Sequence, residues 1–454
     1  MPKITFMGAG SSVFAKNVLG DSMMTPALEG STIALYDIDA KRLQESHSML
    51  EAINRNSGSK ANIETYLGIP SRKEALCGAS YVVNAIQVGL YDPCTITDFE
   101  VPKKYGLRQT IADTLGIGGI FRALRTIPVM LDFARDMEEV CPDAWFLNYT
   151  NPMCALTGAM LRLTNVKTVG LCHSVQVCAS GLLEGLGMPY DEGVQWKIAG
   201  INHMAWLLEI TRDGQDLYPE IKRLAAARTE KHNDMVRYEI MKRFGYYVTE
   251  SSEHNAEYMP YFIKGRYPEL IERFNIPLDE YPRRCVRQIE QWEERGHELT
   301  NNPTLTHTRS HEYASYIMEA METNRPIKIG GNVLNRGLIT NLPSAAVVEV
   351  PCLVDKSGIQ PTKIGALPPQ LAAMDMTNVN VQSLTVEAAL SGRREHIYQA
   401  AMLDPHTAAE LDPEQIFALV DDLIAAHGDW LPAYSDGDRA IAHRAAEHHA
   451  QAHG

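Results

Sequence analysis

Three short segments near the middle of the chain carry side chains that are suited to metal chemistry. They are Asn148-Tyr-Thr-Asn151-Pro152, Gly170-Leu-Cys172-His173-Ser174 and Gly200-Ile-Asn202-His203-Met204. A lone thiol at Cys172 and a lone imidazole at His203, each in its own Gly-led turn, are suited to ligate one divalent metal. If a dinucleotide binds beside them, redox and Lewis-acid chemistry are expected in one pocket.

A nucleotide-binding pattern opens the chain. The apolar run from Pro2 to Met7 leads into the turn Gly8-Ala-Gly10-Ser11 and then into an apolar helical pattern. A strand, turn and helix in this order direct backbone N–H groups and the helix dipole at a pyrophosphate. Val13 stands where the usual pattern has its third glycine, which weakens the match.

An acid at the end of the next strand strengthens the nucleotide assignment. The apolar run Thr32-Ile-Ala-Leu-Tyr-Asp37 ends at the place where a ribose 2′-hydroxyl is accepted. A carboxylate there also repels a 2′-phosphate, so we expect NAD and not NADP. The alternative is a unit without nucleotide whose glycines only make a tight turn, but a turn alone does not require Asp37.

Composition predicts a cytoplasmic enzyme with more than one domain. The chain has 454 residues, and its formal net charge of −14 disfavours nucleic acid and anionic membranes as partners. No apolar run approaches the ~20 residues of a membrane helix, and a strand that begins at Lys3 leaves no room for a signal peptide. The eight cysteines are dispersed without a C-x-x-C pair, so a buried thiol is the default interpretation for each.

Strand and helix signals alternate through about residue 190. Strand-like runs cover 80–87, 140–148 and 166–172, with helical patterns at 127–139 and 153–163. This alternation predicts a Rossmann-like, doubly wound parallel sheet in an α/β fold. Such sheets bind ligands beyond the carboxyl ends of their strands, and the ends predicted here are Asn84, Asn148 and Cys172.

The pattern changes after about residue 195. Residues 196–213 alternate like antiparallel strands, and mixed patterns follow. We therefore predict an NAD-binding domain over 1–195, and an α+β domain over 196–434 that serves catalysis, substrate binding and oligomerisation. The His- and Ala-rich tail, 435–454, is more typical of a solvated helix or frayed end than of a metal site.

Three further polar segments allow two interpretations each. Asp113 precedes a Gly-rich turn, which is either a second anion-binding turn or an ordinary helix start. The stretch 249–261 is too rich in titratable groups for a core element, so it is either functional or a solvated loop. Arg309 opens an apolar helical pattern and faces either solvent or a hydroxyl-rich ligand.

Taken together, these motifs resemble glycoside hydrolase family 4, the NAD- and metal-dependent group, and within it the bacterial α-galactosidases of the melibiase type. The resemblance runs from Lys3 to about Pro432. Its motifs are the Gly8-Ala-Gly10-Ser turn, Ala112 to Gly119, Asn148 to Pro152, Leu171 to Ser174, Gly200 to His203, Ser252 to Tyr258, Asn341 to Pro343 and Val347 to Pro351. This family is an exception to glycoside hydrolysis by two carboxylates, so its mechanism follows from the resemblance and not from spacing.

The resemblance implies hydrolysis of α-galactosides without net redox change. Cys172 and His203 would hold a divalent metal, expected to be Mn²⁺, beside the C2 and C3 oxygens of the sugar. NAD⁺ would take hydride from C3, a base would remove the acidified C2 proton, and the leaving group would be eliminated. Water would then add, and NADH would return the hydride.

The resemblance also assigns roles to individual residues. Tyr258 would be the base, with Tyr261 as the second choice; Asp113 would orient it, and His173 would protonate the leaving oxygen. Thr95 lies where relatives acting on phosphorylated sugars carry basic residues, which points to a sugar without phosphate. The remaining expected contacts are Gly8, Gly10, Ser11, Asp37 and Asn84 for NAD, and Asn148, Asn151 and Arg309 for substrate. We expect a homodimer or homotetramer.

Three alternatives remain at this point. An α-galacturonidase of the same family is the nearest, because relatives with a Cys–His pair also accept uronic acids. A hydroxy-acid dehydrogenase would need a His–Asp pair and a carboxylate-binding arginine but no metal thiolate. A sugar or nucleotide sensor without activity would have no reason to keep Cys172, His203 and Tyr258 together.

Overall fold

The computed structural model describes residues 1–434, and its N-terminal half alternates strands with helices. The strands are β1 (Lys3–Met7), β2 (Thr32–Asp37), β3 (Asn62–Leu67), β4 (Tyr81–Asn84), β5 (Trp145–Asn148) and β6 (Lys167–Gly170). The helices are α1 (Ser12–Met23), α2 (Ala40–Ser57), η1 (Ile69–Ser71), α3 (Arg72–Leu76), η2 (Leu90–Thr95), α4 (Ile96–Lys103), α5 (Gly116–Val140), α6 (Met153–Leu163) and α7 (His173–Gly185).

These six strands are parallel and lie side by side in the order β3-β2-β1-β4-β5-β6. This is the strand order of a sheet that binds a dinucleotide where the order reverses, beside β1 and β4. The apolar strands β1 and β4 are buried along almost their whole length. The predicted Rossmann-like fold is therefore confirmed.

Two details of the strand prediction differ from the structure. The sequence analysis missed β3, an edge strand whose half-exposed residues do not give an apolar run. It also began the fourth predicted strand at Val140, which is the last residue of α5, whereas β5 begins at Trp145. The apolar side of a helix end and the start of a buried strand look alike in sequence, because both bury consecutive large side chains.

The second half of the chain adds further strands, both long and short, and further helices. The strands are β7 (Val194–Ile201), β8 (Met204–Arg212), β9 (Gln215–Asp216), β10 (Tyr247–Val248), β11 (Ile327–Leu334), β12 (Val347–Asp355) and β13 (Gly358–Pro361). The helices are α8 (Tyr218–Ala227), α9 (Met235–Phe244), α10 (Ser252–Tyr258), α11 (Glu269–Arg273), α12 (Glu280–Thr300), α13 (Ala314–Thr323), α14 (Pro369–Ser391), α15 (Arg394–Leu403), α16 (Pro405–Glu410), α17 (Pro413–His427) and η3 (Gly428–Trp430).

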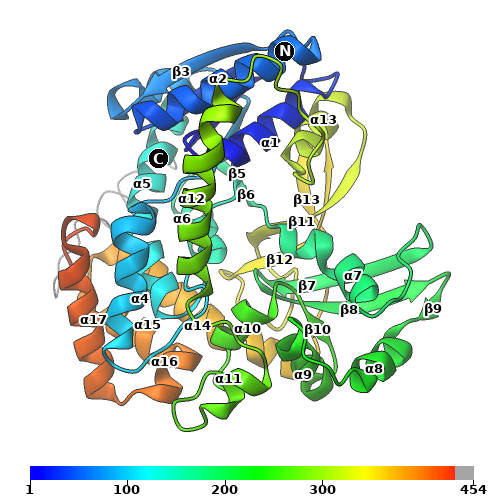
Figure 1. Ribbon diagram of the computed structural model, residues 1–454, viewed down its shortest axis with the longest axis vertical. Helices are drawn as coiled ribbons and strands as arrows, with labels where there is room; N and C mark the ends of the chain where they lie inside the picture. The colour runs from blue at the N-terminus through cyan, green and yellow to red at the C-terminus, as the bar shows by residue number, and fades with distance from the viewer. Residues whose placement is uncertain (435–454) are drawn as a thin grey trace.

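The later strands extend the parallel sheet in an antiparallel manner, in the order β6-β11-β12-β7-β8-β10. The antiparallel run predicted at 196–213 is confirmed as the β7–β8 hairpin. β6 and β11 are joined at Gly170 and Asn332, just before Cys172. One sheet thus carries the loops of both halves of the chain to a common region (Figure 1), and the division after residue 195 stays a prediction.

The last helices pack back onto the N-terminal half. Helix α14 lies against α5 and α6, and α17 lies against α4 (Figure 1). A buried ion pair ties these layers together: Asp98 of α4 lies 2.6 Å from Arg125 of α5 and 2.9 Å from His427 of α17. These contacts make the C-terminal helices part of the core that supports the nucleotide-binding sheet.

Among the described residues, no helix is long and apolar enough to span a membrane. All eight cysteines lie within that part of the chain and are free thiols. The predicted His- and Ala-rich tail, 435–454, lies outside the described residues.

Candidate active site

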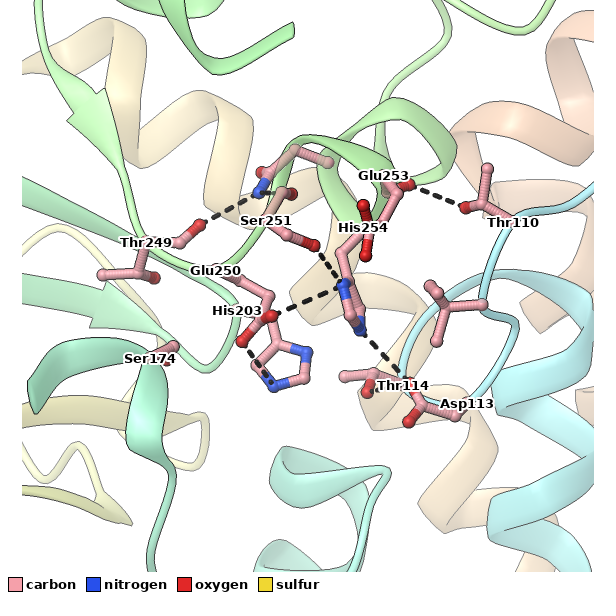
Figure 2. Close-up of polar contacts among 12 residues, drawn as sticks. Thr110, Asp113, Thr114, Ser174, His203, Thr249, Glu250, Ser251, Glu253 and His254 are labelled. Carbon is pink, nitrogen blue, oxygen red and sulfur yellow. Dashed lines mark hydrogen bonds and ion pairs between the residues drawn. The ribbon is translucent and has the colours of Figure 1, made fainter. Parts of the chain in front are cut away.

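Side chains from separate parts of the sequence meet beside the carboxyl end of β6. Cys172 comes just before α7, and His203 lies in the turn between β7 and β8. Glu250 and His254 come from the segment after β10 and from α10, and Asp113 from the loop before α5. Figure 2 shows Glu250 between the two imidazoles, with Asp113 beyond His254.

The donor atoms of this cluster fit a divalent metal. The Cys172 sulfur, a ring nitrogen of His203 and a carboxylate oxygen of Glu250 all lie within 4.8 Å of one another. A second group, Asp113, His203 and His254, meets the same limit. Sulfur, nitrogen and oxygen donors together are typical of first-row transition-metal sites. The sequence analysis predicted Cys172 and His203 here and missed Glu250 and His254, which looked like two of many polar residues in one stretch.

Two residues of the cluster have backbones in the left-handed region. The φ angle is 64° at His203 and 64° at Glu250. Residues other than glycine rarely adopt this conformation, and it costs on the order of 1–3 kcal/mol. The fold therefore holds both side chains in place against a local preference, as functional sites often do.

Burial and charge act against each other at His203 and Glu250. Burial disfavours the charged imidazolium, but the interactions with Cys172 and Glu250 outweigh it and raise the pKa of His203 to about 10. Burial likewise opposes ionisation of Glu250, but the neighbouring imidazoles of His254 and His203 lower its pKa to about 2. Nε2 of His203 and Oε2 of Glu250 are 3.5 Å apart, so the two side chains can form an ion pair when the imidazole is protonated.

Tyr258 reaches the cluster from the end of α10. Its side chain is completely buried, and its phenolic oxygen lies 3.0 Å from Nδ1 of His203. Burial, together with the charges of Asp113 and Glu257, holds the pKa of Tyr258 well above its usual range. Tyr261, in contrast, is 49% exposed and packs against Phe262 and Phe244. The structure brings Tyr258, and not Tyr261, to the cluster.

A buried carboxylate links Tyr258 to the loop that carries Asp113. Glu257 accepts hydrogen bonds from three consecutive backbone N–H groups, those of Thr110 (2.7 Å), Ile111 (3.2 Å) and Ala112 (2.8 Å). The Gly-rich region was predicted to be either an anion-binding turn or an ordinary helix start. The N–H groups that precede it do bind an anion, and this anion is the protein's own Glu257 carboxylate.

The expectation that 249–261 is too polar for a core element is wrong. Helix α10 is almost wholly buried although it carries Glu257 and His254. Burial is tolerated because these side chains have partners: Glu257 binds the backbone of the preceding loop, and Nδ1 of His254 lies 2.6 Å from the Ser251 hydroxyl. Such partners lie far away in sequence or require a particular turn, so composition cannot show them.

His173 lies at the start of α7 with an acidic partner. Its Nε2 is 2.7 Å from Oε2 of Glu312, and this contact raises the pKa of His173 although burial opposes it. The rings of Tyr149 and Tyr313 lie 6.0 and 6.1 Å away. The imidazole is only partly buried, so it can exchange protons with a ligand or with water. Glu312 is a second residue that the sequence analysis did not single out.

The predicted nucleotide turn joins β1 to α1, with the predicted acid beside it. Gly8 has φ of 88°, and the Gly10 N–H donates to Oδ2 of Asp37 at 2.6 Å, so turn and acid lie side by side. Ser11 immediately precedes α1, and no side chain caps the start of this helix. Val13 is 51% exposed on that turn. Because it does not face the sheet, a glycine is not needed there for helix–strand packing.

The asparagines at the strand ends contact one another. Asn84 and Asn148 are paired in register on neighbouring strands, and the Asn84 amide donates to Oδ1 of Asn148 at 2.9 Å. The Asn148 amide donates in turn to the carbonyl of Thr150 at 3.1 Å. Both ends of Asn148 therefore already have protein partners. The buried Oδ1 atoms of Asn151 and Asn84 have no hydrogen-bond partner among the described residues.

Arg309 is not brought to the cluster. Its guanidinium lies 4.2 Å from the centre of the Tyr316 ring on α13 and donates to the hydroxyl of that residue at 2.8 Å. It also donates to Thr25, just after α1, at 3.3 Å. The contacts of Arg309 join α13 to the nucleotide-binding half, and a contact with substrate stays a prediction.

Comparisons with known proteins agree with this arrangement over most of the chain. Residues 3–188 match the family model described as family 4 glycosyl hydrolase, and residues 198–407 match that of the family 4 glycosyl hydrolase C-terminal domain. An α-galactosidase of Bacillus subtilis is 65% identical and aligns over 96% of this chain and 100% of its own length. An α-galactosidase of Rhizobium meliloti is 34% identical, and the alignment covers 98% of this chain and 92% of the relative.

The fold also has a close counterpart among solved structures. The 6-phospho-β-glucosidase of Thermotoga maritima, solved with manganese, NAD⁺ and glucose-6-phosphate, superposes with a TM-score of 0.78. The match covers 95% of this chain and 100% of that one, at 19% sequence identity. At this identity the likeness shows a shared fold.

Proposed function

We propose that this chain, which belongs to glycosyl hydrolase family 4, hydrolyses α-galactosides with the help of NAD and a divalent metal, Mn²⁺. The observation that carries the proposal is the meeting of Cys172 and His203 in one partly buried cluster. The name of the 65% identical relative supports the substrate class. A hydroxy-acid dehydrogenase or a sensor would have no use for this pair of donors.

Both cofactors would be held by residues that lie near one another in the fold. Gly8, Gly10, Ser11 and Asp37 would bind the dinucleotide, with Asn84 at the neighbouring strand end. Cys172 and His203 would hold the metal. When bound, NAD supplies a reversible hydride acceptor, and the metal supplies Lewis acidity at the sugar oxygens.

Tyr258 is the proposed base for the C2 proton. Its phenolic oxygen faces the ring of His203, and Asp113 belongs to the same group of side chains. The high pKa of the buried phenol in the metal-free protein reflects burial and nearby negative charge. A cation held by Cys172 and His203 would lower that pKa by opposing both effects.

His173 is the proposed proton donor to the leaving oxygen. The hydrogen bond to Glu312 favours the protonated imidazole, as an acid requires. His173 follows Cys172 directly in the sequence at the start of α7, and Tyr313, whose ring lies 6.1 Å from that of His173, donates to the Cys172 carbonyl at 3.0 Å. Asn151, with its unpaired Oδ1, is the better placed of the two predicted asparagines to bind a sugar hydroxyl.

The surroundings favour a neutral sugar. The carboxylate of Asp113 lies in the cluster, and that of Glu312 contacts His173. A uronic acid or a phosphorylated sugar would add a further negative charge, which these carboxylates would repel. Thr95 is uncharged and buried, and its hydroxyl donates to the carbonyl of Leu90 at 3.0 Å. It therefore cannot form an ion pair with a phosphate.

A panel of p-nitrophenyl glycosides tests the proposal. We expect hydrolysis of the α-galactoside in the presence of NAD⁺, Mn²⁺ and a thiol reductant, and little activity on the α-galacturonide or a 6-phosphoglucoside. Omission of NAD⁺ or addition of EDTA should abolish the activity. A higher kcat/KM for the galacturonide would overturn the substrate assignment, and full activity without NAD⁺ would overturn the mechanism.

We also propose that the protein acts in the cytoplasm as a homodimer or homotetramer. Its eight free cysteines, one of them a proposed metal ligand, suit a reducing compartment. Light scattering coupled to size-exclusion chromatography tests the assembly, since a mass near 50.5 kDa would identify a monomer.

A further inference from the structure

We infer that Glu250 is a third protein ligand of the metal, so that the site is built from one thiolate, one imidazole and one carboxylate. This inference rests on the proposed function, because it concerns the same metal as Cys172 and His203. A Glu250 oxygen lies within 4.8 Å of both donor atoms, a distance that a shared ion would span.

The backbone around Glu250 is fastened to the strand that follows His203. The Thr249 N–H donates to the carbonyl of Ala205 at 2.8 Å, and the Ala205 N–H donates to the Thr249 hydroxyl at 3.1 Å. Residue 249 is thereby paired with a residue only two positions after His203. This pairing sets the distance between the imidazole and the carboxylate independently of their own interaction.

The strained backbone is the second, independent observation. Glu250 adopts φ of 64°, a conformation that glycine would adopt at little cost. A side chain that served only packing or solubility would not require this conformation. The fold instead turns a carboxylate inward at this point, toward a cluster in which His203 has the same unfavourable φ.

The two oxygens of Glu250 have different neighbours. Oε1 lies 3.4 Å from Nδ1 of His254, whose Nε2 lies 3.9 Å from Asp113. Oε2 lies 3.5 Å from Nε2 of His203 (Figure 2). One oxygen can thus bind the metal while the other keeps its contact with His254, as partners beyond the ligand shell usually do.

A carboxylate ligand changes what the site can do. Mn²⁺ prefers oxygen donors and about six ligands in octahedral geometry, so two protein ligands alone would hold it weakly before the sugar arrives. Three protein ligands leave roughly three positions, enough for two sugar hydroxyls and one water. The enzyme would therefore bind Mn²⁺ in the absence of substrate.

Titration of the purified protein with Mn²⁺, followed by the electron paramagnetic resonance of free Mn²⁺, tests this without turnover and without sugar. We expect Glu250→Gln to weaken binding by about 100-fold or more, since even outer partners of ligands contribute 10–100-fold. The matched control is Glu253→Gln, which removes an acid three residues away that pairs with Arg284. This control should keep the affinity within about twofold of the wild type.

The Cys172→Ser variant separates the two proposals. If Cys172→Ser loses Mn²⁺ binding and Glu250→Gln does not, the third ligand is wrong and the proposed metal site stands. If neither variant changes the affinity, the metal site itself is wrong. If both lose binding while Glu253→Gln does not, the inference is supported.

A second variant, which removes the backbone strain at residue 250, tests whether a loss of Mn²⁺ binding is caused by misfolding. Glu250→Gly removes the carboxylate and also the backbone strain, since glycine favours this φ, so the relieved strain should offset part of the stability lost with the contacts to His203 and His254. We expect Mn²⁺ to raise the melting temperature of the wild type and to leave that of Glu250→Gly almost unchanged. An equal rise in both would overturn the inference.

Discussion

The phenolic oxygen of Tyr258 lies 3.0 Å from Nδ1 of His203, so the proposed base and a proposed metal ligand are direct neighbours. A group that contacts the far nitrogen of a metal-binding histidine helps to select the tautomer of that ring. Tyr258 therefore has two expected effects: it removes a proton from the sugar, and it orients His203.

Replacement of this tyrosine should stop the chemistry. We expect Tyr258→Phe to abolish both hydrolysis and the incorporation of deuterium at C2 of galactose during turnover in D₂O, as measured by NMR of the product. Mn²⁺ binding should weaken by about tenfold, because an outer partner of His203 is lost.

Tyr261→Phe is the matched control for this experiment, since Tyr261 is exposed and does not contact the cluster. It should retain the activity of the wild type. If the wild type releases galactose that carries only protium at C2, and shows no isotope effect at C2 or C3, the redox and elimination mechanism is wrong.

The thiol of Cys172 should make activity sensitive to oxidation. Metal binding requires the thiolate, so we expect Cys172→Ser to lose nearly all hydrolysis while NAD⁺ still binds. Mild peroxide should inactivate the wild type, and a reductant should restore it when the thiol has gone no further than a sulfenic acid or disulfide.

Cys77→Ser provides the control, because Cys77 is an exposed thiol on the surface of the nucleotide-binding half. This variant should be as active and as sensitive to peroxide as the wild type. Full activity of Cys172→Ser in EDTA would contradict a role for Cys172 in metal binding.

Asp37 should determine the choice of cofactor. Its carboxylate lies at the end of β2 and accepts the Gly10 N–H, so it faces the proposed ribose site. We expect Asp37→Ala to lower the affinity for NAD⁺ by roughly tenfold and to reduce discrimination against NADP⁺. Dependence of the hydrolysis rate on the concentration of NAD⁺ or NADP⁺ measures the apparent affinity of the enzyme for each cofactor.

The control for this experiment is Asp39→Asn, two residues later, where the side chain caps α2 by accepting the Arg42 N–H. Asparagine is also a good cap, so cofactor preference should not change. Equal activation of the wild type by NAD⁺ and NADP⁺ would overturn the assignment.

Glu257 should make stability depend on pH in an unusual direction. Burial raises its pKa from 4.5 to about 7 in spite of three backbone N–H donors. Between these pH values the folded protein binds more protons than the unfolded chain, so this group makes the free energy of unfolding fall as the pH rises. The contribution is complete below pH 4.5 and is lost as the pH approaches 7, an effect of about 3 kcal/mol.

Urea unfolding of the wild type and Glu257→Gln across this pH range measures the effect. The free energy of unfolding of the variant should fall less steeply with pH, because glutamine does not titrate. Parallel curves for the two proteins would show that Glu257 titrates in the folded state as it does in the unfolded chain.

The sequence by itself predicted those parts of the molecule whose patterns lie within one short stretch of the chain. The run into Gly8, Gly10 and Asp37 predicted the nucleotide-binding unit because strand, turn and acid are neighbours in the chain, and apolar periodicity reports burial directly. The β7–β8 hairpin was predicted for the same reason. Cys172 and His203 stood out because each lies alone in a short, Gly-led turn.

Tertiary structure alone decided which of the polar residues meet. Glu250, His254 and Glu312 look like ordinary charged residues in sequence, and each gains its role from a partner at a distance that the sequence does not encode. Burial of Glu257 depends on three backbone N–H groups nearly 150 residues earlier in the chain. The polar composition of 249–261 therefore led to the wrong prediction that this stretch lies outside the core. A buried charge is tolerated only when partners surround it, and those partners are assembled by the fold and not by neighbours in the chain.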